Sequence, residues 1–336
     1  MLTLDADATL VPPHQRVLVA VSSGADSLAL LGWLLDIERE IVVGHVNHAL
    51  HELRPDQCQA DEDFVRAKCL ELNVRFVAAT LDLPRQNGHI NENIAREGRY
   101  LALAQMAREN NCALVATAHT ATDGLETALI NLMRGGGPQG WLGAPPRRML
   151  DGAIELVRPF WNVPRAATRA YLRVKNWTWR EDASNLDPVF RRNRTRAELL
   201  PLLSEISGRS LDDLARGHAR GATILRDESA LLENLAGAQL SRLTLKREPP
   251  SAPDLLTFDA DGFRALDVAL QRRVLRRAAR EISPALRDLS AAKVEIVRLA
   301  VTEFGRREVW SWPHRVRVEW TGRERGNRVR LWRVGN

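Results

Sequence analysis

A short turn of small and polar residues follows an apolar run near the start of the chain. The run RVLVAV leads into SSGADS, and an amphipathic helix pattern begins directly after it. Backbone N–H groups in such a turn can approach an anion closely, and the following helix points its positive N-terminus at the same place. A phosphate or pyrophosphate fits there, and Asp26 is compatible with it when Mg²⁺ lies between them. The alternative is that Asp26 or Ser27 merely caps the helix.

A second group of polar residues stands in TAHTATDGLET. Asp123 and Glu126 are three residues apart, which places both carboxylates on one face of a helix. The alternative is structural, with Asp123 as an N-cap and Glu126 completing a capping box. In HVNHALH, His45, His48 and His51 are also spaced by three, but a strand that runs into a turn does not keep such side chains together, so a zinc site is not favoured.

Basic residues dominate three segments of a chain whose net charge is +6 and whose isoelectric point is near 9.8. These segments are FRRNRTR (190–196), QRRVLRRAAR (271–280) and the tail RVRVEWTGRERGNRVRLWR (315–333). Arginine interleaved with tryptophan suits phosphate contacts and base stacking, so a polyanionic partner is favoured. Solvated helix faces and charged edge strands are the alternative for each segment.

Apolar, β-branched runs alternate with helical patterns in the first half of the chain. The runs cover residues 16–22, 41–48, 74–81 and 112–119. Nearly continuous apolar runs joined by helical crossovers predict a parallel sheet covered on both faces. Ligands of such sheets bind at the carboxyl ends of the strands, which is where SSGADS, NHALHE and HTATDGLET stand.

The second half of the chain has a different composition, with long helical patterns and then short strands rich in valine, tryptophan and arginine. We therefore predict an α/β domain over 1–207 and a smaller, mainly helical domain with a short β tail over 208–336. Cys58, Cys69 and Cys112 form no CxxC pair, which favours inert thiols. No apolar run approaches the length of a bilayer span, so we expect a cytoplasmic protein without a membrane partner.

Several segments occur in a fixed order that resembles a known enzyme family. SSGADS resembles the SGGxDS loop of the N-type ATP pyrophosphatases, which have an adenine-nucleotide α-hydrolase-like fold. The segments that match further are HVNHAL, NENIAREGRY (91–100), TAHTATDGLETALINLMRGGGPQGWLG (117–143), LVRPF (156–160) and WREDASNLDPVFRRNRTRAELLPLL (179–203). Together they resemble the tRNA(Ile)-lysidine synthetases over residues 15–205, and six ordered motifs are far more specific than one.

The resemblance implies a definite reaction. The family uses ATP to adenylate O2 of the wobble cytidine in a tRNA(Ile) with anticodon CAU, and an amine of free lysine then displaces AMP, which forms lysidine. AMP is a better leaving group than a carbonyl oxygen, and Mg²⁺ with basic groups offsets the charge of the released pyrophosphate. ATP and Mg²⁺ are the implied cofactors. This tRNA and free lysine are the implied partners, and a homodimer is one open oligomeric state.

The matching motifs also imply residue roles. The nucleotide is expected to contact Ser22, Ser23, Gly24, Ala25, Asp26, Ser27, His48 and His119. Asp26 and Asp123 are the expected Mg²⁺ ligands, and Glu126 is the candidate for holding the lysine amine. Catalysis is assigned to Asp26, Asp123, Glu126, Arg99 and Arg194. Arg192, Arg194, Arg196, Arg272 and Arg273 are expected to contact tRNA, although the first three also suit the active-site carboxylates.

Two positions depart from the family pattern. Ser23 replaces the first glycine of SGGxDS, which the turn tolerates only if the φ angle of Ser23 is not strongly positive. Thr122 replaces the first acid of a paired DD, which removes a charge near the expected Mg²⁺. Two further interpretations therefore compete with the lysine ligase. One is a thiolase-like ATP pyrophosphatase, although the cysteine pairs of that class are missing. The other is a non-catalytic RNA-binding descendant.

Overall fold

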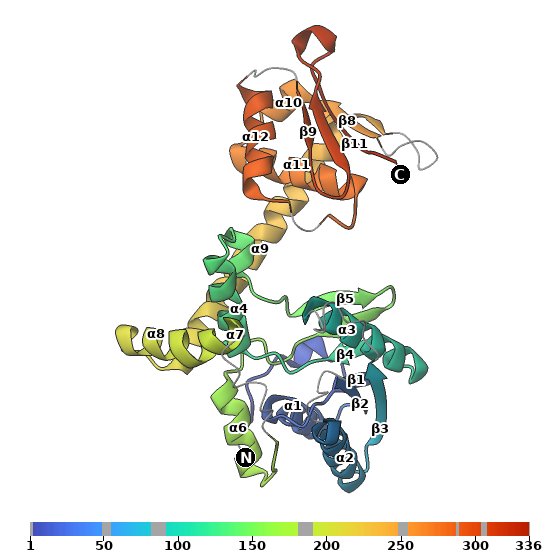
Figure 1. Cartoon of the computed structure of the whole chain (residues 1–336), viewed down its shortest axis with the longest axis vertical. Helices are drawn as coiled ribbons and strands as arrows, with labels where there is room; N and C mark the ends of the chain where they lie inside the picture. The colour runs from blue at the N-terminus through green and yellow to red at the C-terminus, as the bar shows by residue number, and fades with distance from the viewer. Residues whose placement is uncertain are drawn as a thin grey trace. The chain divides into compact units, whose positions relative to one another are not determined.

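The computed structural model describes residues 3–48, 55–81, 92–180, 191–247, 255–286, 289–303 and 308–335. The chain divides into two compact units, Met1–Thr223 and Ile224–Asn336, whose elements are labelled in Figure 1. The division falls within α9 (Leu211–Leu243), whereas the expected domain boundary, between residues 207 and 208, stands before this helix. Each unit contains a hydrophobic core of its own.

A six-stranded sheet forms the centre of the first unit, in the order β3-β2-β1-β4-β6-β5. Its strands are β1 (Val17–Ala20), β2 (Ile41–His48), β3 (Arg75–Leu81), β4 (Leu114–Ala116), β5 (Arg147–Asp151) and β6 (Ile154–Val157). Neighbouring strands are parallel except β5 and β6, which are antiparallel. The predicted parallel sheet is confirmed, and β5 and β6 extend it.

Helices cover both faces of this sheet. α1 (Ala25–Asp36), α2 (Pro55–Glu71) and α6 (Arg165–Val174) pack on one face, and α3 (Glu92–Glu109) packs on the other. The first unit also contains α4 (Ala121–Met133), α5 (Pro138–Trp141), α7 (Arg191–Arg194) and α8 (Leu200–Ser207). Val17 and Val19 of β1 pack in a core with α1, α2 and α6. Leu18, which points to the other face, packs with Leu103 of α3. Figure 1 accordingly shows α3 across the sheet from α1 and α2. This alternation confirms a sheet that is buried on both sides.

Two crossover connections begin at the neighbouring strands β1 and β4. β1 pairs with β2 on one side and with β4 on the other. The chain therefore leaves β1 and β4 in opposite directions across the sheet, which is the arrangement in which α/β sheets open a ligand crevice at their carboxyl ends. The turns after β1 and β4 carry the two polar groups that the sequence singles out, at 22–27 and 119–127.

The second unit combines helices with an antiparallel sheet in the order β7-β8-β11-β10-β9. The helices are α10 (Ala260–Arg264), α11 (Val268–Ile282) and α12 (Ala291–Thr302). The strands are β7 (Thr244–Arg247), β8 (Leu255–Asp259), β9 (Val309–Ser311), β10 (Val316–Trp320) and β11 (Arg328–Arg333). The predicted helices and terminal strands are confirmed, and β7 and β8 complete the sheet. Of the helices in the described part of the chain, none has the length and apolar character needed to cross a bilayer.

Candidate active site

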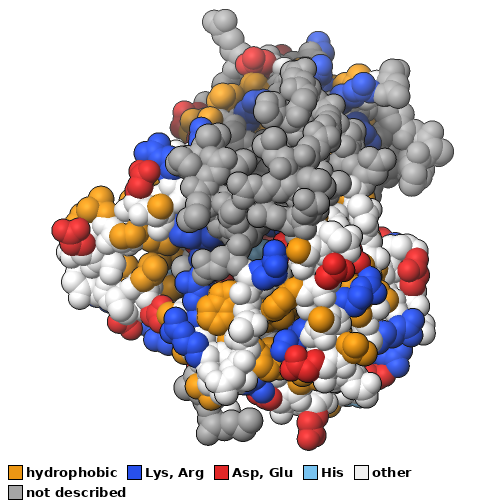
Figure 2. Space-filling view, turned by 60° about the horizontal axis from the view of Figure 1, so that its bottom comes forward, with side chains coloured by type: hydrophobic (Ala, Val, Ile, Leu, Met, Phe, Trp, Pro, Cys, Tyr) orange, Lys and Arg blue, Asp and Glu red, His pale blue; other side chains and the backbone are white. Residues whose placement is uncertain are grey.

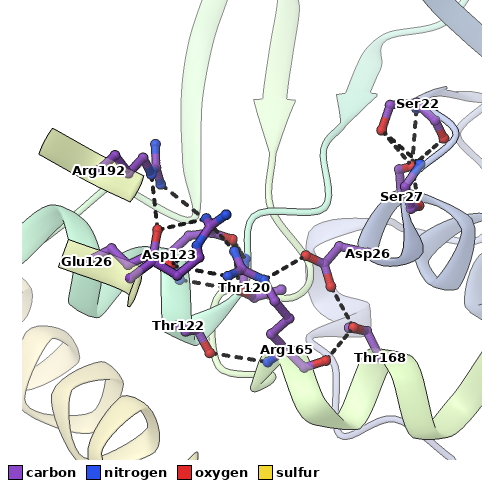
Figure 3. A network of polar contacts seen from close by, with 12 residues as sticks. Ser22, Asp26, Ser27, Thr120, Thr122, Asp123, Glu126, Arg165, Thr168 and Arg192 are labelled. Atoms are coloured by element: carbon purple, nitrogen blue, oxygen red, sulfur yellow. Dashed lines mark hydrogen bonds and ion pairs between the residues drawn. The ribbon is translucent and has the colours of Figure 1, made fainter. Parts of the chain in front are cut away.

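The turn after β1 is held in shape by its own serine. Gly24 is the N-cap of α1 and makes no side-chain cap bond, so the alternative in which Asp26 or Ser27 caps this helix is wrong. The Ser27 hydroxyl accepts a hydrogen bond from the Ser22 N–H at 3.1 Å and lies 2.7 Å from the Ser22 carbonyl oxygen, as drawn in Figure 3. Ser23 is not among the described residues with a positive φ angle, so serine is accommodated where the family has glycine.

Asp26 projects from the first turn of α1 and is held by two side chains of α6. Thr168 Oγ1 lies 2.5 Å from Asp26 Oδ1, and Arg165 Nε lies 3.1 Å from Asp26 Oδ2. Burial raises the pKa of the Asp26 carboxyl, and the charge of Arg165 offsets this effect only in part. The ionised carboxylate therefore depends on a cation at close range.

Asp123 takes part in the capping of α4 and also contacts the arginines of the site. Thr120 is the N-cap of α4, and Asp123 completes a capping box by accepting a bond from the Thr120 N–H at 2.9 Å through Oδ2. The predicted alternative box, with Asp123 as cap and Glu126 as partner, is therefore wrong. Because the capping bond uses Oδ2, the other oxygen of Asp123 is turned to the arginines described next.

One guanidinium joins the three carboxylates. Arg165, the first residue of α6, places Nε 3.1 Å from Asp26 Oδ2, Nη2 2.7 Å from Asp123 Oδ1 and Nη1 3.1 Å from Glu126 Oε1. Its backbone N–H donates to Thr122 Oγ1 at 3.2 Å. Figure 3 shows its side chain between Asp26 and the acids of α4. Arg165 is not among the site residues predicted from the sequence. Its place at the start of a helix, five residues after Phe160 of the LVRPF motif, is the signal that could have drawn attention to it.

Two arginines of the segment that follows 181–190 complete the cluster. Arg192 Nε lies 3.0 Å from Glu126 Oε2, and Arg196 Nε lies 2.8 Å from Glu126 Oε1. The Glu126 side chain is completely buried and bonded through both oxygens. Arg194 instead pairs with Glu198 on an exposed surface. The structure therefore brings Arg192 and Arg196 to the carboxylates and leaves Arg194 outside this cluster.

Charge is balanced within the cluster. Asp26, Asp123 and Glu126 supply three negative charges, and the guanidinium groups of 165, 192 and 196 supply three positive ones. Burial opposes ionisation of Asp123, but Arg165 and Arg192 outweigh it and hold the pKa of that carboxyl well below its ordinary value. The same carboxylates raise the pKa of Arg165 against the effect of its burial. Asp123, Arg165 and Arg192 are therefore charged together at neutral pH.

A second basic group surrounds Tyr100 on α3. Arg99 lies 5.7 Å and Arg148 lies 4.6 Å from the centre of the Tyr100 ring, and the guanidinium of buried Arg158 reaches the hydroxyl at 3.5 Å. Burial acts to raise the pKa of Tyr100, but the charges of Arg158, Arg96 and Arg99 together outweigh it and lower this pKa to about 8. Burial and the Arg158 charge lower the pKa of His119 to about 3, so this imidazole is neutral.

The remaining predicted residues lie apart from the acidic cluster or outside the described side chains. The side chain of His48 is not described. His45 is buried, with Nδ1 2.9 Å from the Val21 carbonyl oxygen. In the second unit, Arg272 pairs with Glu295 at 2.8 Å, and Arg273 Nη1 lies 3.6 Å from Glu233. Among the described residues, no group of three or more His, Cys, Asp and Glu side chains is arranged to hold a metal ion.

Comparisons with known proteins show the family of the chain. A family profile described as "PP-loop domain" matches residues 4–203, so the first unit is a PP-loop domain. The chain is 34% identical to a tRNA(Ile)-lysidine synthase of Symbiobacterium thermophilum, over 82% of this chain and 57% of that protein. It is 37% identical to a tRNA(Ile)-lysidine synthase of Gloeobacter violaceus, over 80% of this chain and 78% of that protein. The chain belongs to the tRNA(Ile)-lysidine synthase family.

A solved structure supports the same fold. The chain is similar to the U34-tRNA thiolase NcsA from Methanococcus maripaludis, a protein solved with its [4Fe-4S] cluster. The TM-score is 0.50 at 16% sequence identity, and the match covers 64% of this chain and 74% of the thiolase. At this identity the likeness concerns the fold alone. Cys69 and Cys112 are free thiols and are buried.

Proposed function

We propose that this chain uses ATP to join lysine to C2 of the wobble cytidine in a tRNA(Ile) with anticodon CAU, forming lysidine. Family membership supports the reaction class. The observation that carries the proposal is the cluster of three carboxylates and three arginines directly beside the phosphate-loop turn. Buried and half-buried charged groups are costly to desolvate, and a non-catalytic RNA-binding protein has no need for six of them in one cluster.

The proposed reaction has two steps. First, O2 of the cytosine attacks the α-phosphorus of ATP, the bond to the β-phosphate oxygen breaks, and pyrophosphate leaves. An amine of lysine then attacks C2, the bond from C2 to O2 breaks, and AMP leaves with that oxygen while the amine loses a proton. The turn at 22–27 and the α1 N-terminus are proposed to hold the phosphates. The arginines of the cluster are proposed to balance the charge that develops.

The oxygens of Asp26 and Asp123 fit Mg²⁺. Asp26 Oδ2 and Asp123 Oδ1 approach a single cationic group, Arg165, at 3.1 and 2.7 Å, so both oxygens already point at one place. Two carboxylates with water and phosphate oxygens suffice for Mg²⁺ in nucleotide sites. Asp26 and Asp123 would hold the ion, which would supply charge stabilisation for the phosphates. Holding a lysine amine at Glu126 would require one of its three arginines to move, since both of its oxygens are bonded.

Exposed arginines are proposed to contact the tRNA backbone. Arg194 is 63% exposed and Arg272 is 51% exposed, although both pair with a glutamate. On the face shown in Figure 2, Lys and Arg side chains lie interspersed with Asp and Glu. Several spread contacts therefore fit better than a single basic patch on this face. Because the substrate is a tRNA, the proposed location is the cytoplasm, and a homodimer stays a prediction that sedimentation would test.

Labelled lysine tests the proposed function. The chain is incubated with ATP, Mg²⁺ and transcripts of tRNA(Ile) that carry either CAU or GAU in the anticodon. We expect label to enter the CAU transcript only, because cytidine is present at the wobble position of that transcript alone. Absence of label from the CAU transcript, with tRNA binding intact, would favour the non-catalytic alternative. Incorporation of sulfur instead of lysine would favour the thiolase alternative.

A further inference from the structure

Arg165 occupies the position between the carboxylates that are proposed to hold a metal. The same two oxygens that fit Mg²⁺, Asp26 Oδ2 and Asp123 Oδ1, each accept a hydrogen bond from this guanidinium. A metal ion and a guanidinium cannot both contact these oxygens at bonding distance, because two cations would then meet in a half-buried site. Either cation can neutralise the acids, but only one at a time.

Arg165 differs from the other arginines of the cluster in its contact with Asp26. Within the described residues, Asp26 has ion-pair contact with Arg165, whereas Arg192 and Arg196 contact Asp123 and Glu126. The backbone of Arg165 is fixed by its N–H bond to buried Thr122, and the Arg165 side chain is 18% exposed. The long side chain can therefore turn while its helix stays in place.

We propose that Arg165 is an exchangeable cation: it holds the metal site closed without nucleotide, and it moves to the phosphate groups of the nucleotide when a divalent cation takes its place. A guanidinium released beside a phosphate loop has a natural anionic partner, since its fork of donors matches phosphate oxygens. The inference rests on the proposed Mg²⁺-dependent use of ATP. It adds that the metal and the nucleotide phosphates bind together. A metal that binds alone displaces Arg165 from the carboxylates and leaves its guanidinium without an anionic partner.

Binding of Mn²⁺, followed by electron paramagnetic resonance, tests the first half of this proposal without nucleotide. We expect Arg165→Gln to bind Mn²⁺ about tenfold more tightly than the wild type, because removing the resident cation frees both carboxylates. Arg192→Gln removes the same charge from the cluster but leaves Asp26 bonded, so its effect should be about threefold or less. Arg108→Gln, which frees the exposed carboxylate of Asp151, is the control outside the site and should change nothing.

Binding of inorganic pyrophosphate to the Mn²⁺-loaded protein tests the second half. Here Arg165→Gln should bind about tenfold more weakly than the wild type, because the displaced guanidinium is missing. Circular dichroism establishes that each variant is folded. If Arg165→Gln does not fold, Arg165→Lys replaces it: an ammonium cannot span three carboxylates, so Mn²⁺ affinity should still rise, by a smaller factor.

The proposal is overturned if Arg165→Gln and Arg192→Gln raise Mn²⁺ affinity equally, because that would be a general charge effect. It is also overturned if Mn²⁺ affinity is unchanged, or if pyrophosphate affinity is unchanged. These measurements use neither tRNA nor lysine. Lysine incorporation with unaltered Mn²⁺ binding would therefore reject this inference alone, and altered Mn²⁺ binding without lysine incorporation would reject only the proposed function.

Discussion

At the scale of single residues, Thr122 shows how the chain works without the acid that the family pattern has at this position. The Thr122 side chain is buried, and its hydroxyl accepts the backbone N–H of Arg165. The three carboxylates of the cluster are already matched by three arginines. A fourth carboxylate is therefore unnecessary for charge balance, and threonine fixes the start of α6 instead.

We predict that Thr122→Asp retains lysine incorporation and alters its magnesium dependence only modestly. The added carboxylate gives the cluster an unmatched negative charge, so saturation with Mg²⁺ should come at a lower concentration, by a factor of about three. Labelled lysine in the CAU transcript is measured across a magnesium titration for both proteins. A wild type that is inactive at every magnesium concentration, together with an active variant, would contradict this interpretation of Thr122.

His119 gives a prediction for stability against pH. Its pKa of about 3 in the folded chain lies below its ordinary value of 6.5, so the unfolded chain binds the proton more readily. The stability that the neutral imidazole contributes is fully present above pH 6.5 and is lost as the pH falls towards 3, at up to about 1.4 kcal/mol per pH unit. Compared with His119→Gln, the wild type should lose more stability between pH 6.5 and 4.5 in urea unfolding. Parallel stability curves for the two proteins would show that His119 does not titrate in this range.

At the scale of elements, α6 positions the site by packing closely on α1. Arg165 and Thr168 stand one turn apart on α6 and both reach Asp26, while Tyr171 of the next turn donates to Asp36 at 2.6 Å. Gly32 permits this approach, because a Cβ atom there would lie 3.1 Å from the Tyr171 hydroxyl. The distance between the two helices therefore sets the distance between Asp26 and its cation.

We predict that Gly32→Ala lowers the free energy of unfolding by about 1–3 kcal/mol and weakens ATP-dependent activity, because the added methyl group pushes α6 away from α1. Gly217→Ala is the matched control. It also lies in a helix, but its Cβ would meet nothing within 4 Å, so it should stabilise the chain by about 0.5–1 kcal/mol. Equal effects of the two substitutions would mean that α1 and α6 separate without cost.

The sequence predicted the elements that carry strong patterns and missed those that depend on tertiary contacts. The first four strands, β1 to β4, are apolar runs bounded by turns, so periodicity suffices to find them. β5 reads RRMLD, a mixture typical of an edge strand, and gives no such signal. Arg165 was missed for a different reason. Its partners lie 139, 42 and 39 residues away, and no local pattern reports contacts over that separation.

At the scale of the whole molecule, the continuous α9 explains why the boundary between the two units was difficult to place from sequence. The helix runs from Leu211 to Leu243 and continues through Gly217, Gly221 and Gly237, and the division falls inside it. Beyond it, the second unit buries its own apolar residues, with Phe258, Phe263 and Val318 completely buried. The different composition of the second half of the chain therefore indicated a second unit, but not where the contacts divide.

Salt dependence should separate arginines that bind tRNA from those that serve the carboxylates. We predict that Arg194→Gln weakens tRNA binding, reduces its salt slope by about one and leaves ATP affinity nearly unchanged. Arg196→Gln should also impair ATP use, because Arg196 contacts Glu126 at 2.8 Å. Filter binding across a salt series and a separate ATP-binding measurement check both variants. An unchanged salt slope for Arg194→Gln would remove this arginine from the tRNA-binding surface.

The central claim is that one charged cluster supports ATP-dependent attachment of lysine to tRNA, and the stoichiometry of AMP formation tests it most directly. AMP and tRNA-bound lysine are measured together with the CAU transcript, for the wild type and for Asp26→Asn. Asp26 is chosen because Asp123 also completes the capping box of α4. We predict one AMP per lysine for the wild type, and loss of both products by at least about a hundredfold in the variant. Lysine attachment without AMP formation, or full activity in Asp26→Asn, would contradict the account.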